Sequence, residues 1–266
     1  MMPLADENPI RSVPWVTIAL MITCAVVFFW VQPTGRNVFD DLGLTRVQND
    51  DLEFSLHWAA IPCEIREGRP LTADEVRATF HDGGTDACAV GSSNSPAVAP
   101  HKHVYLAIII SIFLHGSVAH LVGNLLFLWV FGNNIEDRRG PFGFTCFYLA
   151  SGLVATATQY LVDPTSTVPL IGASGAIAGV MGAYFVWFPR ARIKTLIIFG
   201  PVLFRKVQAA WLLGLWFVQQ FIVFRSSTSV AWMAHVGGFA FGVIVGLVWR
   251  RSDHPDAHLL PPVGLK

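Results

Sequence analysis

Four polar residues in otherwise apolar segments are of the types that carry out acyl transfer. His120 and Asn124 are four residues apart, so on a helix they share one face. Ser174 follows a proline-containing loop and therefore falls near a helix N-terminus, where free backbone N–H groups point at an adjacent anion. His235 lies in the segment AHVGGFAFGVIVG. A serine hydroxyl needs a base to remove its proton, and imidazole is the base suited to neutral pH.

The third member of a serine-protease triad, a carboxylate, is missing from every apolar segment. Ser174 and His235 would therefore act as a dyad. The backbone N–H of Ser174 and the side chains of His120 and Asn124 could supply donors to the tetrahedral oxyanion. Each residue also has a structural alternative, because a buried histidine can simply be hydrogen-bonded and a serine among glycines can be a packing contact.

Small residues surround the serine and follow the histidine. They are Gly172, Gly175, Gly179 and Gly182 in one segment and Gly238, Gly242 and Gly246 in the other. Helices lined by glycine can approach closely, which would bring Ser174 within hydrogen-bond reach of His235. Spacing alone leaves that contact open.

Rival membrane hydrolases fit the chain less well. A zinc protease would need H-E-x-x-H, and no glutamate accompanies His115 or His120. An aspartyl protease needs two aspartates inside the membrane, and the apolar segments contain none. The nucleophile motif G-x-S-x-G fails at Ala176. We therefore expect neither a metal ion nor a cofactor.

The elements that position these residues belong to a polytopic membrane protein. The chain has 266 residues, of which 53% are apolar and 14% charged, against about 25% charged in soluble domains. A net charge of zero and a pI of about 7.1 argue against a nucleic-acid partner. The 20 phenylalanines exclude a disordered chain. The expected fold class is all-α, embedded in the lipid bilayer.

Six windows without Asp, Glu, Lys or Arg are each long enough to cross a hydrocarbon core of about 30 Å. They are 13–35, 103–135, 141–162, 164–189, 207–224 and 226–249. The second window is too long for one perpendicular helix, and we expect it to break near His115. It would then give a surface helix at 104–114 and a span at 118–135. The apolar stretch 195–204 is too short to cross, and we expect an interfacial loop there.

Lysine and arginine in short loops set the orientation. Basic residues gather at 138–139, 190–206 and 250–251, which places both termini in the cytoplasm. Residues 1–12 would be a short cytoplasmic N-terminus, 13–31 a first transmembrane helix rather than a cleaved signal peptide, and 251–266 a cytoplasmic tail. Short loops and the lack of a transit peptide favour a bacterial plasma (inner) membrane.

The segment 32–103 would then lie outside the cytoplasm. It holds 11 of the 18 acidic residues and is the one stretch of soluble composition. Cys63 and Cys88 both lie in it, so a disulfide closing a loop of about 25 residues is as reasonable as two free thiols.

The polar residues described above lie in four short motifs that follow one another along the chain. FLHGSVAHLVGN contains His115, His120 and Asn124, and it is followed by GNNIEDRRG, by GASG around Ser174 and by AHVGG around His235. Together these motifs resemble the rhomboid intramembrane serine proteases, over about residues 104–250. The resemblance implies a six-transmembrane-helix rhomboid bundle with a long extracytoplasmic first loop and a catalytic core at 104–250. Its substrates would be transmembrane segments of other proteins.

By matching position, the resemblance also implies roles for individual residues. Ser174 would be the nucleophile, His235 the general base and acid, and His120 and Asn124 the lining of the oxyanion hole. His115, Gly172 and Gly175 would support the site, and Glu136 and Arg138 would form a structural pair.

The chain departs from the family pattern in its support of the histidine. Many relatives have an aromatic residue four positions after the serine, stacked on that histidine, and here the position is Ala178. The first loop lacks the family's Trp-Arg pair and contains the Cys63–Cys88 insertion.

A catalytically inactive rhomboid-like binder of membrane-protein clients is the alternative function. A transporter would need paired intramembrane charges or an internal repeat, and neither is visible. The sequence does not determine the substrate or the oligomeric state.

Overall fold

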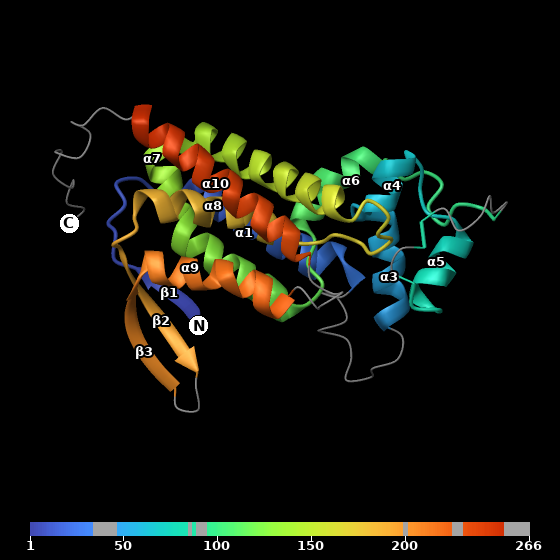
Figure 1. The fold of residues 1–266 in the computed structure, drawn as a ribbon, viewed down its shortest axis with the longest axis horizontal. Helices are drawn as coiled ribbons and strands as arrows, with labels where there is room; N and C mark the ends of the chain where they lie inside the picture. Colours follow the sequence, from blue (N-terminus) through green and yellow to red (C-terminus); the bar gives the residue numbers. More distant parts are fainter. Residues whose placement is uncertain (34–46, 85–86, 89–94, 199–201, 225–230, 253–266) are drawn as a thin grey trace.

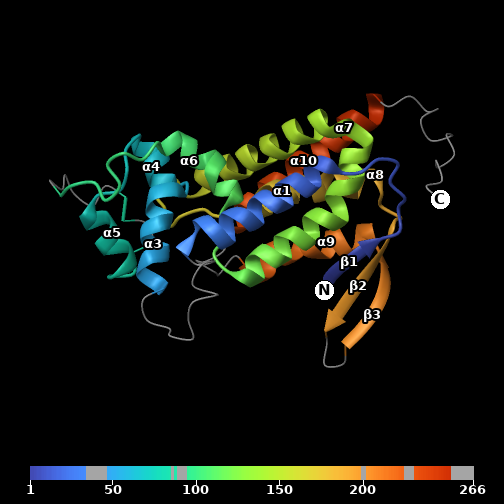
Figure 2. The same ribbon diagram turned by 180° about the vertical axis from the view of Figure 1, so that it is seen from behind.

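Long helices lie side by side in the computed structural model, with a small sheet at one end and a group of short helices at the other (Figures 1 and 2). The structure describes the chain apart from residues 34–46, 85–86, 89–94, 199–201, 225–230 and 253–266. The expected tail at 251–266 thus falls almost entirely outside the described residues, as does part of the segment 32–103. β1 (Met2–Asp6) and the end of α10 (Trp232–Ser252) lie at the sheet end.

The bundle begins with α1 (Trp15–Val26), which continues as a π-helical turn, η1 (Val27–Val31). α6 (Val104–Ile110) and the 3-10 turn η2 (Ser111–Phe113) follow where the surface helix was expected. α7 (Val118–Val162) is bent at Gly140, whose φ of 71° is non-helical, directly before Pro141.

The first part of α7 runs past position 135, where the span was expected to end. Its continuation carries charged residues that have partners. The Glu136 carboxylate accepts hydrogen bonds from the backbone N–H groups of Val16 and Thr17 at the start of α1, at 2.8 and 2.7 Å. The Arg138 guanidinium lies 4.4 Å from the ring centroid of Trp187. Each member of the expected Glu136–Arg138 pair therefore joins α7 to a different helix.

Glycines hold α8 (Ser174–Trp187) directly against α10, as the two glycine-lined segments suggested. A Cβ atom at Gly238 would collide with the carbonyl oxygen of Gly175, and one at Gly242 with that of Gly179. The two backbones are thus in contact. No side chain larger than a hydrogen atom fits at these crossing points.

The expectation of an interfacial loop at 195–204 is wrong. Residues 195–198 belong to β2 (Arg192–Ile198) and residues 202–204 to β3 (Val202–Gln208), which pair antiparallel, and β1 pairs with β2 to complete a three-stranded sheet. Arg192 and Lys194 are exposed while Ile193 and Thr195 are buried, which is the alternation of a strand. The fold is therefore mostly helical rather than all-α.

The segment before α6 is a small helical unit. It contains α3 (Val47–Trp58), α4 (Pro62–Glu67) and α5 (Ala73–Phe80), at the end of the molecule opposite the sheet (Figure 1). A disulfide joins Cys63 to Cys88, and Leu56, Ile61 and Leu71 pack beside it in a separate apolar cluster. We call residues 47–103 the insertion.

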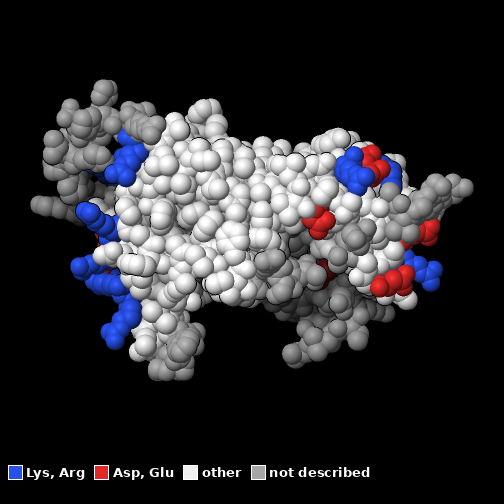
Figure 3. Space-filling view, in the orientation of Figure 1, with Lys and Arg blue, Asp and Glu red and all other residues white. Residues whose placement is uncertain are grey.

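Among the described helices, α7 and α10 are long and apolar enough to cross a membrane by length and composition. Four further apolar helices are shorter, at 15–31, 104–113, 174–187 and 209–222. The last of these comprises α9 (Ala209–Gln219) and most of the π-helical turn η3 (Gln220–Phe224). Charged side chains on the face in Figure 3 gather at the two ends of the molecule and leave the middle uncharged. This distribution suits a protein surrounded by lipid.

Candidate active site

The contact between serine and histidine that spacing left open is present in the structure. Ser174 is the first residue of α8, and His235 lies in the first turn of α10. The Ser174 Oγ atom is 2.8 Å from His235 Nε2. Close helix packing sets this distance. A Cβ atom at Gly175 would lie 2.6 Å from the Cβ atom of Ala155 on α7, and a Cβ atom at Gly238 on α10 would collide with the Gly175 carbonyl oxygen. The pair has the geometry of a nucleophile and its base.

Two residues of α9 and η3 contact the histidine, and sequence reasoning missed both. The Gln220 Oε1 atom lies 2.8 Å from His235 Nδ1, on the opposite side of the ring from Ser174. The Trp216 ring lies 5.8 Å from the imidazole between centroids, tilted by 44°. An aromatic residue from α9 thus packs on the histidine where Ala178 offers none. A glutamine in an apolar segment was the signal in the sequence, because such residues are costly in lipid.

The expected oxyanion donors flank the residues that precede the serine. Gly172 has a φ of 123°, and a Cβ atom there would lie 2.8 Å from His120 Nε2 and 3.7 Å from Asn124 Nδ2. Both side chains therefore point at the backbone leading into Ser174. Among the described residues, Asn124 Nδ2 is a buried donor without an acceptor. Such a group is costly unless something else occupies it, such as a substrate oxygen.

His115 lies behind this arrangement rather than at the nucleophile. It is fully buried, and its ring packs edge-on against His120 with centroids 5.2 Å apart. Its backbone N–H and carbonyl are both bonded to the side-chain amide of Gln32, each at 2.9 Å. The end of η1 therefore holds the turn that carries His115. Sequence reasoning also missed Gln32.

A cavity of about 220 Å³ opens beside the Ser174–His235 pair. Its lining includes His120, Asn124, Phe127, Met181, Trp216 and Gln220. The nucleophile, its base and the unpaired amide donor of Asn124 thus face one space. An extended peptide carbonyl could occupy this space and contact all three groups.

The insertion is attached to the loop that leads into Ser174. The carbonyl oxygen of Ala60 accepts a hydrogen bond from the backbone N–H of Leu170 at 2.7 Å, and the backbone N–H of Cys63 donates to the Ser166 carbonyl at 2.9 Å. The hydroxyls of Thr79 and Thr167 are 2.6 Å apart. Two parts of the insertion thus contact this loop at residues 166–170.

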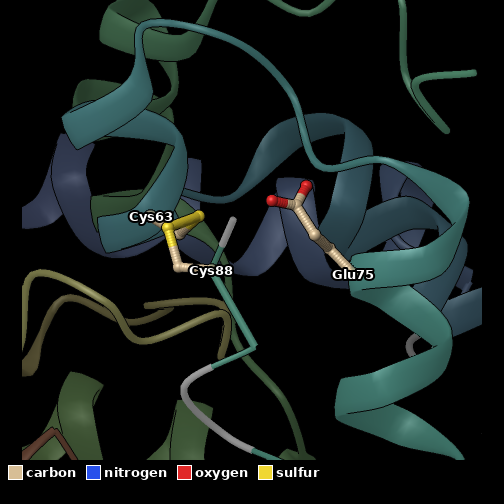
Figure 4. A group of neighbouring side chains, drawn as sticks. All are labelled: Cys63, Glu75 and Cys88. Carbon is tan, nitrogen blue, oxygen red and sulfur yellow. A yellow bond between two sulfur atoms is a disulfide. The ribbon is translucent and has the colours of Figure 1, made fainter. Parts of the chain in front are cut away.

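The residue types at the disulfide could also hold a metal. Sulfur atoms of Cys63 and Cys88 and a carboxylate oxygen of Glu75 lie within 4.8 Å of one another (Figure 4). The two sulfurs are bonded to each other, and Arg69 Nη2 forms an ion pair with Glu75 at 2.8 Å. In this state the sulfur atoms are not available as thiolate ligands.

Comparisons with known proteins match the same part of the chain. A family model described as the Rhomboid domain matches residues 102–252. Rhomboid-like protein 11, chloroplastic, of Arabidopsis thaliana is 32% identical over 151 residues, which are 55% of this chain and 52% of that protein. Presenilin-associated rhomboid-like protein A, mitochondrial, of Danio rerio is 31% identical over 56% of this chain and 40% of its own length.

A bacterial relative is similar over a shorter stretch. Rhomboid protease GluP of Bacillus subtilis (strain 168) is 40% identical over 72 residues, 27% of this chain and 14% of that protein. The chain spans about half or less of the length of the curated relatives it matches. Their names place several of them in chloroplasts or mitochondria, so they do not support the expectation of a bacterial membrane.

Proposed function

This chain belongs to the rhomboid family of membrane proteins, and we propose that it is a serine endopeptidase that cleaves transmembrane segments of other membrane proteins. The observation that carries the proposal is the 2.8 Å contact between Ser174 Oγ and His235 Nε2 at the wall of a cavity. The family includes intramembrane serine proteases, and it acts on membrane proteins within the bilayer.

The proposed reaction is acyl transfer in two halves. Ser174 Oγ attacks the carbonyl carbon of the scissile peptide while its proton passes to His235 Nε2. The tetrahedral intermediate collapses, the C–N bond breaks, and the same proton moves from Nε2 to the departing nitrogen. A water molecule then attacks the acyl carbon while His235 Nε2 accepts its proton. The C–Oγ bond breaks, the proton moves from Nε2 to Ser174 Oγ, and the acid product leaves.

The oxyanion of the tetrahedral intermediate would be held from the side opposite the base. Ser174 is the first residue of α8, so its backbone N–H has no intrahelical partner. Asn124 Nδ2 is a second unpaired donor, and the His120 ring lies beside Gly172. Donors that are fixed before the charge forms stabilise the transition state without reorganisation.

The length of α8 supports chemistry inside the membrane. At 1.5 Å per residue, Ser174 lies about 20 Å along the helix axis from Trp187. Arg138 and Arg139 stack on Trp187, so that end lies at the charged surface. A hydrocarbon core of about 30 Å would then extend roughly 10 Å beyond the serine. Ser174 would then lie below the membrane surface, where it would meet a segment of the substrate that has left its helical conformation.

We further propose six transmembrane spans formed by α1, the two parts of α7, α8, α9 with η3, and α10. The basic residues of the sheet, including Arg192, Lys194 and Arg205, favour the cytoplasm for that end. Both termini would then be cytoplasmic. The insertion would face the opposite compartment, where a disulfide persists.

The proposal is tested with the full chain purified in detergent and returned to liposomes with a model transmembrane substrate. Wild-type protein should release two fragments, and a fluorophosphonate probe should label it at Ser174. Ser174→Ala and His235→Ala should abolish cleavage, and the double variant should lose no more than either single variant because the two residues act as one unit. A folded wild type that binds the substrate but neither cleaves it nor reacts with the probe would instead be an inactive binder.

A further inference from the structure

We propose that Gln220 is a positioning residue that holds His235 in the one neutral tautomer able to act as a base toward Ser174. The inference rests on the proposed function for its catalytic meaning, but the tautomer itself can be measured separately. The Gln220 side chain is 1% exposed and bonded at both ends of its amide. It provides the third group of a nucleophile–base–orienter series, in place of a carboxylate.

The orientation of the amide follows from its second partner. Gln220 Nε2 lies 3.0 Å from the backbone carbonyl oxygen of Trp216. A carbonyl oxygen can only accept, so the amide nitrogen must face it and the amide oxygen must face His235. The reversed amide would bring two acceptors together in a buried site, which is unfavourable.

The proton on the imidazole is fixed in turn. Gln220 Oε1 is an acceptor 2.8 Å from His235 Nδ1, so Nδ1 carries the hydrogen. In the neutral ring, Nε2 then has a free lone pair, and the Ser174 hydroxyl donates to it at 2.8 Å. The other tautomer would turn a lone pair of Nδ1 toward the amide oxygen and would leave Nε2 unable to take the serine proton.

The amide suits this site better than a carboxylate does. An ionised side chain at this depth in lipid is expensive, whereas a glutamine with both ends bonded stays neutral. It lies where η3 begins, and π-helical turns are frequent at functional sites. The packed ring of Trp216 adds a second restraint on the imidazole.

The test combines a tautomer measurement with kinetics. Gln220→Met keeps the length of the side chain but removes the amide. Gln220→Glu restores an acceptor toward Nδ1 in either protonation state, and a protonated glutamate can also donate to the Trp216 carbonyl. Gln219→Met, on the exposed neighbouring residue, is the matched control. Each protein is labelled with 15N-histidine, and the nitrogen chemical shifts of His235 are assigned by their loss in His235→Ala.

Wild type and Gln219→Met should show a protonated Nδ1 and an unprotonated Nε2, and Gln220→Met should show a mixture. In the same set, kcat should fall by roughly 10–10²-fold in Gln220→Met with KM nearly unchanged, since general-base catalysis contributes about 10²–10⁴-fold in all. Gln220→Glu should recover most of the rate. A wild-type ring protonated at Nε2, or a folded Gln220→Met with unchanged shifts and rate, would overturn the proposal. Lack of probe labelling in wild type would instead reject the proposed function.

Discussion

The carbonyl oxygen of Ser111 accepts a hydrogen bond from the backbone N–H of Gly172 at 2.9 Å, two residues before the nucleophile. The hydroxyl of Ser111 accepts a second hydrogen bond, from the backbone N–H of Ala60 at 2.6 Å. The buried residue Ser111 therefore contacts both the insertion and the backbone at Gly172 that leads into Ser174. Movement of the insertion would reach the site through this residue, because packed cores transmit displacement.

We expect Ser111→Ala to lower both stability and turnover. The buried N–H of Ala60 would lose its acceptor, which costs about 1–3 kcal/mol. The hydrogen bond from Gly172 to the Ser111 backbone carbonyl would remain, but Ser111 itself would lose its anchor on the insertion. We therefore expect kcat to fall several-fold at temperatures well below the melting point. Tryptophan-fluorescence melts in detergent and the cleavage assay measure the two effects.

Ser151→Ala is the matched control for this prediction. Ser151 is also fully buried, but its hydroxyl donates to the Phe147 carbonyl one helical turn earlier, so its removal strands no N–H group. It should cost clearly less than Ser111→Ala. Equal losses of stability and turnover in the two variants would mean that the hydrogen bond between Ala60 and Ser111 contributes no more than an ordinary buried serine does.

The Asn124 amide separates a catalytic role from a structural one. Its Nδ2 atom has no acceptor among the described residues, so Asn124→Ala strands no partner and should leave the melting temperature nearly unchanged. If the amide donates to the developing oxyanion, kcat should fall by about 10²–10³-fold, with KM changed much less. His120→Ala should lower kcat in the same way.

Wild-type turnover in a folded Asn124→Ala protein would remove this residue from the oxyanion hole. A loss confined to KM would point instead to ordinary substrate binding.

The approach of α8 to α10 should tolerate no side chain at Gly242. A Cβ atom there would fall on the carbonyl oxygen of Gly179, and neither helix backbone can move without disturbing Ser174 and His235. Gly242→Ala should therefore lower stability by about 1–3 kcal/mol or more. Activity should fall further than stability alone explains. The same melts and cleavage assay apply.

Gly214→Ala in α9 is the control, because nothing lies within 4 Å of a Cβ atom built there. It should be neutral or should stabilise the helix by about 0.5–1 kcal/mol. If Gly214→Ala and Gly242→Ala had the same effect on stability and activity, the close crossing of α8 and α10 would not explain the losses in Gly242→Ala.

The residues that sequence reasoning placed near one another are those with a strong local signal. Ser174 and His235 are polar groups in apolar segments, and their glycine neighbours indicated a close crossing. The start of β2 also had a signal, because charged Arg192 and Lys194 alternate with Ile193 and Thr195, but a criterion of apolar length alone hides that pattern.

Other features of the site depend on tertiary contacts, which the spacing of residues in the sequence does not reveal. Gln219 and Gln220 are adjacent, and only the fold shows that Gln220 is buried while Gln219 is exposed. Gln32 reaches the turn at His115 across 83 positions of the chain. The attachment of the insertion to residues 166–170 likewise comes from tertiary contacts. A single sequence shows the residue types but not these pairings.

The buried ion pair of the insertion offers a test by pH. Lys102 Nζ lies 2.5 Å from Glu64 Oε2, and each side chain is 1% exposed. Burial raises the pKa of Glu64 and lowers the pKa of Lys102, because removal from water disfavours both charges. Lys102 Nζ also donates to the Leu56 carbonyl at 2.8 Å, so the pair joins three parts of the insertion.

We expect Lys102→Met to lower stability at pH 7 by about 3–5 kcal/mol, because it leaves an uncompensated buried carboxylate. Without its cation, Glu64 should have a pKa raised still further. The folded state would then hold a proton that the unfolded state has released, so stability should fall as the pH rises above 4.5, the ordinary value for glutamate. The loss should therefore be smaller at pH 5 than at pH 7.5.

The double variant Glu64→Gln/Lys102→Met should recover most of the stability, since replacing both members of a buried pair is often neutral. It should also lack the pH dependence of Lys102→Met, because glutamine does not titrate. Tryptophan-fluorescence melts at the two pH values measure wild type, Glu64→Gln, Lys102→Met and the double variant. Additive losses in the double variant would show that the charges do not interact. A Lys102→Met protein equally stable at both pH values would show that Glu64 reaches water once its partner is gone, and the insertion would then be looser than its contacts indicate.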